Sequence, residues 1–231
     1  MEFALLVAIL GSLCGAIAGW IISSFTMQLP LRWEHFLTRE AQEHLGMLSD
    51  DQSPPSVLLP PQVDRRFVVV VILCIAISIL IFSAVGFTPS APALMVFAYS
   101  MIAAAIIDQE HMVLPDVIVQ PLLWVGLINV ALVDPSTLRM HVLGAAVGYC
   151  LFRWLPKVGE GDAKLCAAVG AWLGLSALPM FVLVAGALGS VVGLIYYARR
   201  GRTAQCPFGP SLAVAALALM ACKVAGISVP L

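Results

Sequence analysis

Long apolar runs follow one another along almost the whole chain, and they constrain its fold more than any other feature. A helix needs about 20 apolar residues to cross a bilayer, and hydropathy indicates about eight candidate runs. With 61% hydrophobic and 11% charged residues, the chain is predicted to be an all-α, polytopic membrane helical bundle of about eight transmembrane helices. The runs lie near 3–24, 67–87, 91–107, 117–133, 140–156, 165–178, 179–198 and 211–229.

Lysine and arginine residues predict the orientation of these helices, because cytoplasmic loops keep an excess of positive charge. If the N-terminus lies outside, the inner segments receive most of the cations and the outer segments keep almost only Arg139. Three polar segments then share the cytoplasmic face: 108–116, 159–164 and 199–207. The inner cations are Arg32, Arg39, Arg65, Arg66, Lys157, Lys164, Arg199, Arg200 and Arg202.

This orientation divides the chain into three predicted parts. Residues 1–25 form a first transmembrane helix, interpreted as a retained anchor because it lacks the basic start and cleavage site of a secretory signal. Residues 26–66 form a cytoplasmic loop domain that is too short for a sizeable core, with one amphipathic helix near 31–48. Residues 67–231 form a membrane-embedded domain.

The composition argues against several kinds of site. The six cysteines are scattered and form no C-x-x-C pair, so they are predicted to be small core residues and not a disulfide or zinc framework. Glu110 and His111 lack a recognised metal-ligand spacing and are interpreted as solvated loop residues. We therefore expect no metal. The net charge of −1 and the lack of a basic run indicate no nucleic-acid partner.

Two aspartates border apolar runs, where carboxylates usually mark function. Asp108 follows the run 91–107, and a carboxylate at a helix C-terminus is disfavoured by up to about 1 kcal/mol. Asp162 lies in the sequence GEGDAK at 159–164. Structural interpretations stay open for both, with Asp108 as a solvated loop residue and Asp162 as a helix N-cap. Asp116, which precedes another run, is best explained as an N-cap.

Asp108 and Asp162 together predict a catalytic pair. Two spans separate them, so both lie on the same side of the membrane and can meet at neighbouring helix ends. Two adjacent carboxylates cannot both ionise cheaply, so one keeps its proton beside an ionised partner. Such a pair can deprotonate water and protonate a leaving amine, which hydrolyses a peptide without a metal or a covalent intermediate. No Gly-x-Ser-x-Gly elbow suggests another nucleophile.

Three motifs resemble those of the type IV prepilin leader peptidases. An aspartate is followed by Leu-Pro-Asp in the segment 108–116, the pattern G-x-G-D-x-K occurs at 159–164, and Pro-Phe-Gly-Pro occurs at 207–210. All three stand in the order of the family, and the resemblance covers about residues 67–231.

The resemblance implies a GxGD-class intramembrane aspartic protease of the bacterial inner membrane, with its active site facing the cytoplasm. Asp108 and Asp162 match the two catalytic aspartates. The implied partners are prepilins or pseudopilins, which lose a basic leader at the membrane border, and the lipid bilayer. The peptidase itself is expected to need no cofactor. Residues expected to shape the site or approach the substrate are Gly159, Gly161, Lys164, Asp116, Pro207 and Gly209, and Lys164 is expected to hold its loop or to act on the ionised carboxylate.

The front of the chain departs from the family pattern. Many members carry two zinc-associated C-x-x-C pairs in the first cytoplasmic loop and methylate the new N-terminus with S-adenosylmethionine. Residues 26–66 contain no cysteine, although Pro30 and Glu34 match a stretch common in that loop. Methyltransferase activity, with S-adenosylmethionine as its cofactor, therefore stays open, and no zinc is expected.

Two other functional classes also stay open. A proton-coupled transporter would use intramembrane carboxylates, but transporters place them near the bilayer midplane and often show repeated halves. Here the acids lie at one border and no repeat is visible. A non-catalytic assembly subunit of a pilus or secretion apparatus is the other alternative, against which stand two intact aspartates.

Overall fold

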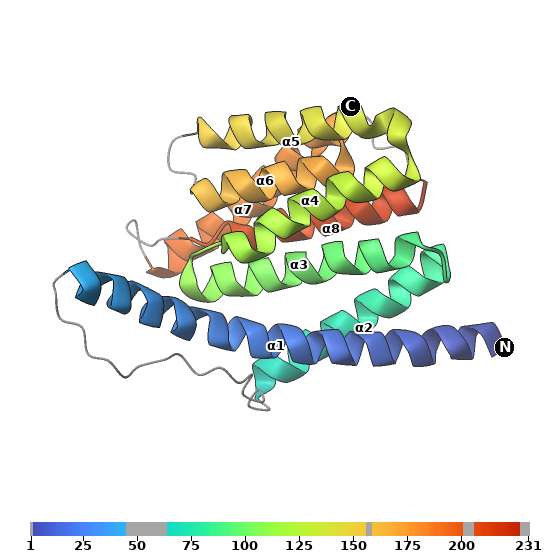
Figure 1. The fold of residues 1–231 in the computed structure, drawn as a ribbon, viewed down its shortest axis with the longest axis horizontal. Coiled ribbons are helices and arrows are strands. Elements are labelled where there is room, and N and C mark those ends of the chain that lie inside the picture. The colour runs from blue at the N-terminus through green and yellow to red at the C-terminus, as the bar shows by residue number, and fades with distance from the viewer. Residues whose placement is uncertain (1, 45–63, 156–158, 201–205, 227–231) are drawn as a thin grey trace. The chain divides into compact units, whose positions relative to one another are not determined.

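The computed structural model describes residues 2–44, 64–155, 159–200 and 206–226, except for the side chains at the chain's start, at 29–44 and at 200. This part of the chain contains eight α-helices, two short 3₁₀ helices and no strand, so the predicted all-α class is confirmed (Figure 1). The elements are α1 (Glu2–His44), α2 (Arg65–Val85), α3 (Ser90–His111), α4 (Asp116–Val133), η1 (Pro135–Thr137), α5 (Leu138–Arg153), α6 (Glu160–Leu173), η2 (Leu175–Ala177), α7 (Leu178–Arg200) and α8 (Gly209–Val224).

Within the described residues, five segments are long and apolar enough to cross a membrane, which confirms a polytopic bundle. The three remaining helices, α5, α6 and α8, have 16, 14 and 16 residues, fewer than the roughly 20 that a full crossing takes. The structure thus has the eight helices that were predicted, and helix length supports a full crossing for five of them among the described residues. The five segments are Ala4–Gln28, Arg65–Val85, Ser90–His111, Asp116–Val133 and Leu175–Arg199.

The run predicted at 165–178 is not one helix. Helix α6 begins earlier, at Glu160, and ends at Leu173 because Gly174 takes a φ of 88°, a left-handed conformation that favours glycine. Apolar composition alone could not locate this break, since the residues on both sides are hydrophobic.

The predicted boundary at residue 25 does not interrupt the first helix. Helix α1 continues to His44, so it includes Pro30 and most of the amphipathic helix expected near 31–48. The segment 31–44 contains three glutamates, two leucines and two arginines, which favour helix. The rest of the predicted loop, 45–63, lies outside the described residues, and the assignment of 26–66 as a cytoplasmic domain stays a prediction.

The chain divides into two compact units, Met1–Leu80 and Ile81–Leu231. In the first unit, α1 and α2 approach closely along glycines spaced by four residues. A Cβ at Gly15 would lie 2.4 Å from the Cα of Ile75, and one at Gly19 would lie 2.7 Å from the Cα of Val71. Small residues at this spacing let membrane helices pack backbone to backbone.

Helix α6 is the core of the second unit. Every side chain from Leu165 to Leu173 is buried, and Figure 1 shows α6 between α5 and α4. Helix α5 reaches the α6 backbone through glycines: a Cβ at Gly170 would lie 2.2 Å from the carbonyl oxygen of Gly144, and one at Gly148 would lie 2.7 Å from that of Cys166. The contact leaves no room for a methyl group.

Polar contacts hold the C-terminal end of α6 against α4 and α8. Trp172 Nε1 donates to the carbonyl oxygen of Leu122 on α4 at 2.9 Å. Lys223 Nζ, on α8, donates to the carbonyl oxygens of Trp172 at 3.1 Å and Leu173 at 3.4 Å. A cation here satisfies carbonyls that a helix end leaves unpaired. Because α6 is one continuous helix, these contacts also constrain its N-terminal end, which carries Asp162.

Candidate active site

Asp108 lies inside the last turn of α3 and is 6% exposed. Its interpretation as a solvated loop residue is therefore wrong. The helix ends only at His111, and Met112, with a φ of 54°, donates its backbone N–H to the carbonyl oxygen of Asp108 at 2.8 Å. The carboxylate thus sits at the negative end of the α3 dipole and needs compensation from elsewhere.

The N-terminus of α8 supplies that compensation. Gly209 is the first residue of α8, and its N–H donates to Asp108 Oδ2 at 2.7 Å. The first N–H groups of a helix have no partner within it and carry its positive end, so they favour an anion. The sequence predicted only that Gly209 shapes the site, whereas in the structure its N–H directly contacts the candidate catalytic carboxylate of Asp108.

Only glycine fits at position 209. An added Cβ would lie 2.7 Å from both the Cβ and Oδ2 of Asp108 and 2.8 Å from its Cγ. Real Cβ atoms essentially never approach other atoms this closely. The glycine of the Pro-Phe-Gly-Pro motif is therefore explained by the approach of the α8 backbone to the carboxylate.

Phe208 anchors this motif, a role that the sequence analysis missed. A Cβ at Gly189 of α7 would lie 2.2 Å from the Phe208 ring, which therefore covers that glycine. On α5, the ring of Phe152 lies 6.4 Å from that of Phe208, centroid to centroid. Pro207 is buried beside it. The phenylalanine of the motif could have indicated this anchoring role, because a large apolar side chain next to a functional glycine usually packs against the rest of the protein.

Asp162 occupies the third position of α6, and Gly159 is the N-cap. The interpretation of Asp162 as the N-cap itself is thus wrong, although its carboxylate does serve the helix start: Gly159 N–H donates to Asp162 Oδ2 at 3.3 Å. This is the reciprocal half of a capping box, because glycine has no side chain to complete the other half.

The pKa of Asp162 is raised to about 6, chiefly by burial and in part by the negative charge of Asp108, while the hydrogen bond from the Gly159 N–H acts to lower it. The structure therefore brings the two predicted aspartates into electrostatic contact from α3 and α6. An elevated pKa on one carboxyl next to another is the pattern of an acid–base pair.

Gly161 joins two of the sequence motifs. A Cβ at this position would lie 2.8 Å from the Cβ of Leu114, in the Leu-Pro-Asp segment. At Gly159 an added Cβ would make only an ordinary contact, 3.4 Å from Asp162 Oδ2. The close approach predicted for both glycines thus has a structural counterpart at Gly161, where it is made by the protein itself.

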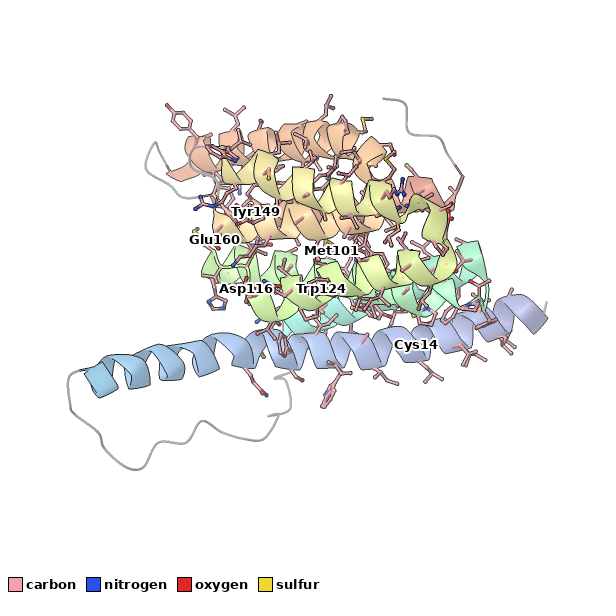
Figure 2. All side chains as sticks on the ribbon, turned by 45° about the horizontal axis from the view of Figure 1, so that its top comes forward. Cys14, Met101, Asp116, Trp124, Tyr149 and Glu160 are labelled. Carbon is pink, nitrogen blue, oxygen red and sulfur yellow. The ribbon has the colours of Figure 1, made fainter. Side chains whose placement is uncertain are left out.

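Lys164 pairs with two carboxylates at the same end of the unit. Its Nζ lies 2.9 and 3.0 Å from the two carboxylate oxygens of Asp116 and 3.1 Å from Glu160 Oε1. These interactions raise the pKa of Lys164. Figure 2 shows Asp116 and Glu160 near each other at this end. Of the two roles expected for Lys164, the geometry supports holding the loop, since the lysine ties the start of α4 to the start of α6.

Asp116 is not an N-cap. Pro115 holds that position, Asp116 is the first residue of α4, and no side-chain cap hydrogen bond forms. The carboxylate is 51% exposed and binds Lys164 instead. Sequence position suggested a local role because the lysine is 48 residues away.

No cluster of three or more metal-ligating side chains occurs among the described residues. His111 Nε2 and Glu110 Oε2 lie 3.8 Å apart on the surface. Pro30 and Glu34, expected in the methylation loop, belong to α1, but their side chains are outside what the structure describes.

Comparison with known proteins agrees with the site. Residues 95–194 match the model of the Type IV leader peptidase family. A prepilin leader peptidase/N-methyltransferase of Pseudomonas aeruginosa is 37% identical over 142 residues, covering 56% of this chain and 49% of the relative. A type 4 prepilin-like proteins leader peptide-processing enzyme of Escherichia coli O78:H11 is 39% identical over 137 residues, covering 54% and 50%.

A third relative aligns over more of its length. The prepilin leader peptidase/N-methyltransferase of Pseudomonas putida is 28% identical, covering 89% of this chain and 87% of the relative. The chain spans about half the length of the first two relatives. No solved structure matches significantly. The segment that carries both Asp108 and Asp162 matches the Type IV leader peptidase family.

Proposed function

We propose that this protein is a membrane-embedded aspartic endopeptidase that removes the basic leader from prepilins or pseudopilins. One observation carries the proposal: the buried Asp108 of α3 and the half-buried Asp162 of α6 act on each other electrostatically, and the pKa of Asp162 is raised to about 6. The match of 95–194 to the leader peptidase family names the reaction and substrate class for this pair.

The surroundings of the two aspartates assign them different roles. Asp162 keeps the shared proton, because its pKa is raised by burial and by its neighbour. Asp108 is the ionised partner, because the Gly209 N–H and the positive end of α8 stabilise its negative charge. In the first step, Asp108 takes a proton from water while the water oxygen attacks the scissile carbonyl carbon. Asp162 gives its proton to the carbonyl oxygen.

The second step reverses these proton positions. The tetrahedral intermediate collapses, the C–N bond breaks, and the leaving nitrogen takes the proton held by Asp108. Asp162 regains a proton from the intermediate as the carbonyl reforms. The pair thus returns to its starting state, and water has been consumed without a covalent enzyme intermediate.

The inner membrane, with the site facing the cytoplasm, is the proposed location. Five membrane-capable segments make the protein multi-pass, and the distribution of lysine and arginine supports the orientation. A basic leader would then meet the catalytic end from the cytoplasm. Asp108 lies in the last turn of α3, near a membrane border and away from the midplane position that a transporter carboxylate would favour.

N-methylation of the new N-terminus with S-adenosylmethionine is a second candidate activity. The names of the P. aeruginosa and P. putida relatives include N-methyltransferase, and Pro30 and Glu34 are present in this chain. Zinc is not part of the proposal, since the segment 26–66 has no cysteine.

The test is leader removal from a prepilin by the detergent-solubilised protein, followed on a gel. We expect Asp108→Asn and Asp162→Asn to abolish cleavage while the protein remains inserted and folded. Asp64→Asn, which changes an exposed aspartate just before α2, is the matched control and should cleave normally. Normal processing by either active-site variant would refute the assignment. Absence of cleavage by the wild type would favour a non-catalytic assembly subunit.

The same reaction tests the second activity. With S-adenosylmethionine present, the mass of the mature N-terminal peptide reports whether one methyl group has been added. An unmethylated product would restrict the protein to proteolysis.

A further inference from the structure

A cavity lies at the end of the second unit opposite the two aspartates. Helices α3, α6 and α8 each have one end at the aspartate pair: α3 ends there, whereas α6 and α8 begin there. The start of α3 and the last turns of α6 and α8 contribute to a cavity of about 340 Å³. The 22 residues of α3 span about 33 Å at 1.5 Å per residue, so this cavity is separate from the catalytic end.

The cavity contains one cation and one anion. Lys223 comes from α8, and Asp134 comes from the turn between α4 and α5. Ser136 donates a hydrogen bond to Asp134 Oδ1 at 2.5 Å, which lowers the pKa of this aspartate. Asp134 is therefore a stable carboxylate at neutral pH. Both charges act electrostatically on His141, which also lines the cavity, so the three groups are close together.

Donor capacity remains on the lysine. The ammonium of Lys223 has three protons, and two of them bind the carbonyl oxygens of Trp172 and Leu173. The third is available to a ligand oxygen. Among the residues that the structure describes, Lys223 forms no ion pair with Asp134 or His141, so the α6 carbonyls hold the ammonium in place without neutralising its charge.

His141 has a defined tautomer. It is 6% exposed, and its Nδ1 lies 2.8 Å from the carbonyl oxygen of Ala171. A carbonyl only accepts, so Nδ1 carries the proton, and in the neutral ring Nε2 is an acceptor. The cavity therefore offers a donor on Lys223 and acceptors on Asp134 and His141.

The rest of the lining is mainly apolar. Leu94 of α3, Val130 and Val133 of α4 and Met220 of α8 contribute to it. Val133 is 65% exposed, at the end of a segment that is long and apolar enough to cross a membrane. A soluble solute would leave this apolar surface wet, whereas a hydrocarbon chain would cover it.

We propose that this cavity binds a phospholipid whose headgroup carries both a phosphate and a primary ammonium, as in phosphatidylethanolamine. The phosphate accepts the third proton of Lys223, the ammonium donates to Asp134 and His141, and an acyl chain covers the apolar lining. A headgroup with a phosphate but no ammonium would pair with Lys223 and bring no cation to the Asp134 carboxylate. The opposite charges of the cavity therefore favour the zwitterion.

Native mass spectrometry of the full chain in detergent tests this proposal, with phosphatidylethanolamine and phosphatidylglycerol added separately at equal concentrations. We expect the wild type to retain phosphatidylethanolamine about tenfold more tightly, a difference equivalent to about 1.4 kcal/mol. Asp134→Asn should remove this preference while leaving the contacts of Lys223 to α6 intact. Lys223→Met should weaken the binding of both lipids.

Arg139→Gln is the matched control, because Arg139 is an exposed cation near the start of α5 and does not line the cavity. It should bind both lipids as the wild type does. Equal retention of the two lipids by the wild type, an unchanged preference in Asp134→Asn, or an equal loss in Arg139→Gln would each overturn the proposal. Binding of soluble glycerophosphoethanolamine as tightly as the lipid would overturn the assignment to a membrane ligand.

Discussion

Replacing Gly209 by alanine should disable catalysis without unfolding the protein. The new Cβ would lie 2.7 Å from Asp108 Oδ2, whereas ordinary van der Waals contact begins near 3.4 Å. The start of α8 and the carboxylate must therefore separate by about 0.7 Å. Alanine is a better helix former than glycine, so α8 itself should tolerate the change.

Two effects set the expected loss of activity. The separation weakens the 2.7 Å hydrogen bond from the Gly209 N–H to Asp108, and a hydrogen bond to a charged group contributes about 1.5–3 kcal/mol. That range corresponds to a factor of roughly 10 to 150 in rate. Misplacement of a catalytic group by about 1 Å can cost about 100-fold. We therefore expect kcat for leader removal to fall by about 100-fold.

The assay is a time course of prepilin cleavage in detergent, with kcat and KM determined separately. Gly186→Ala is the matched control, because an added Cβ at this α7 position meets nothing within 4 Å. It should cleave at the wild-type rate and be equally or slightly more stable, by up to about 1 kcal/mol. A wild-type kcat in Gly209→Ala, with the variant folded by thermal denaturation, would refute the proposed support of Asp108 by α8.

Three further predictions concern Asp162, Lys164 and Gly170. If protonated Asp162 is the acid, its pKa of about 6 requires kcat to fall roughly tenfold per pH unit above that value; a flat profile from pH 6 to 8 would exclude this role. Lys164→Met removes the bridge to Asp116, but exposed pairs contribute little, so unfolding free energy should stay within about 1 kcal/mol and cleavage should persist. Gly170→Ala places a Cβ 2.2 Å from the Gly144 carbonyl oxygen, and thermal denaturation should show a loss of about 1–3 kcal/mol.

The stability of the protein should also respond to the raised pKa of Asp162. A carboxyl with a pKa near 6 in the folded protein and 3.8 as its ordinary value binds more protons folded than unfolded between those values. Its contribution to the free energy of unfolding therefore falls as the pH rises from about 4 to about 6. Asp162→Asn should lose this component of the pH dependence.

Much of the site was visible in short sequence motifs. Asp108 and Asp162 could be named as a pair because both border apolar runs and an even number of spans separates them. The Pro-Phe-Gly-Pro motif could be recognised, but the contact of Gly209 with Asp108 could not, because the hydrogen bond joins residues 101 positions apart. Local rules likewise gave Asp116 a capping role, since an aspartate before a helix favours one.

The sequence predicted that the helices exist better than it predicted where they begin and end. The apolar run 165–178 conceals the end of α6 at Leu173, because hydrophobicity does not change there and only the backbone of Gly174 marks the break. The spacing of Gly144 and Gly148 was a readable signal of close helix packing, although it does not specify that the partner is α6.

The sequence by itself determined that this chain is helical, membrane-embedded and similar to the Type IV leader peptidase family in the segment that carries both aspartates. These properties follow from local composition, charge distribution and short motifs, each of which is complete within a few neighbouring residues. Only the tertiary structure decided which groups meet: the α8 amide with Asp108, and Lys164 with Asp116. It also decided that a charged cavity forms at the opposite end. Such contacts depend on how distant helices pack, and the packing is set by the whole core.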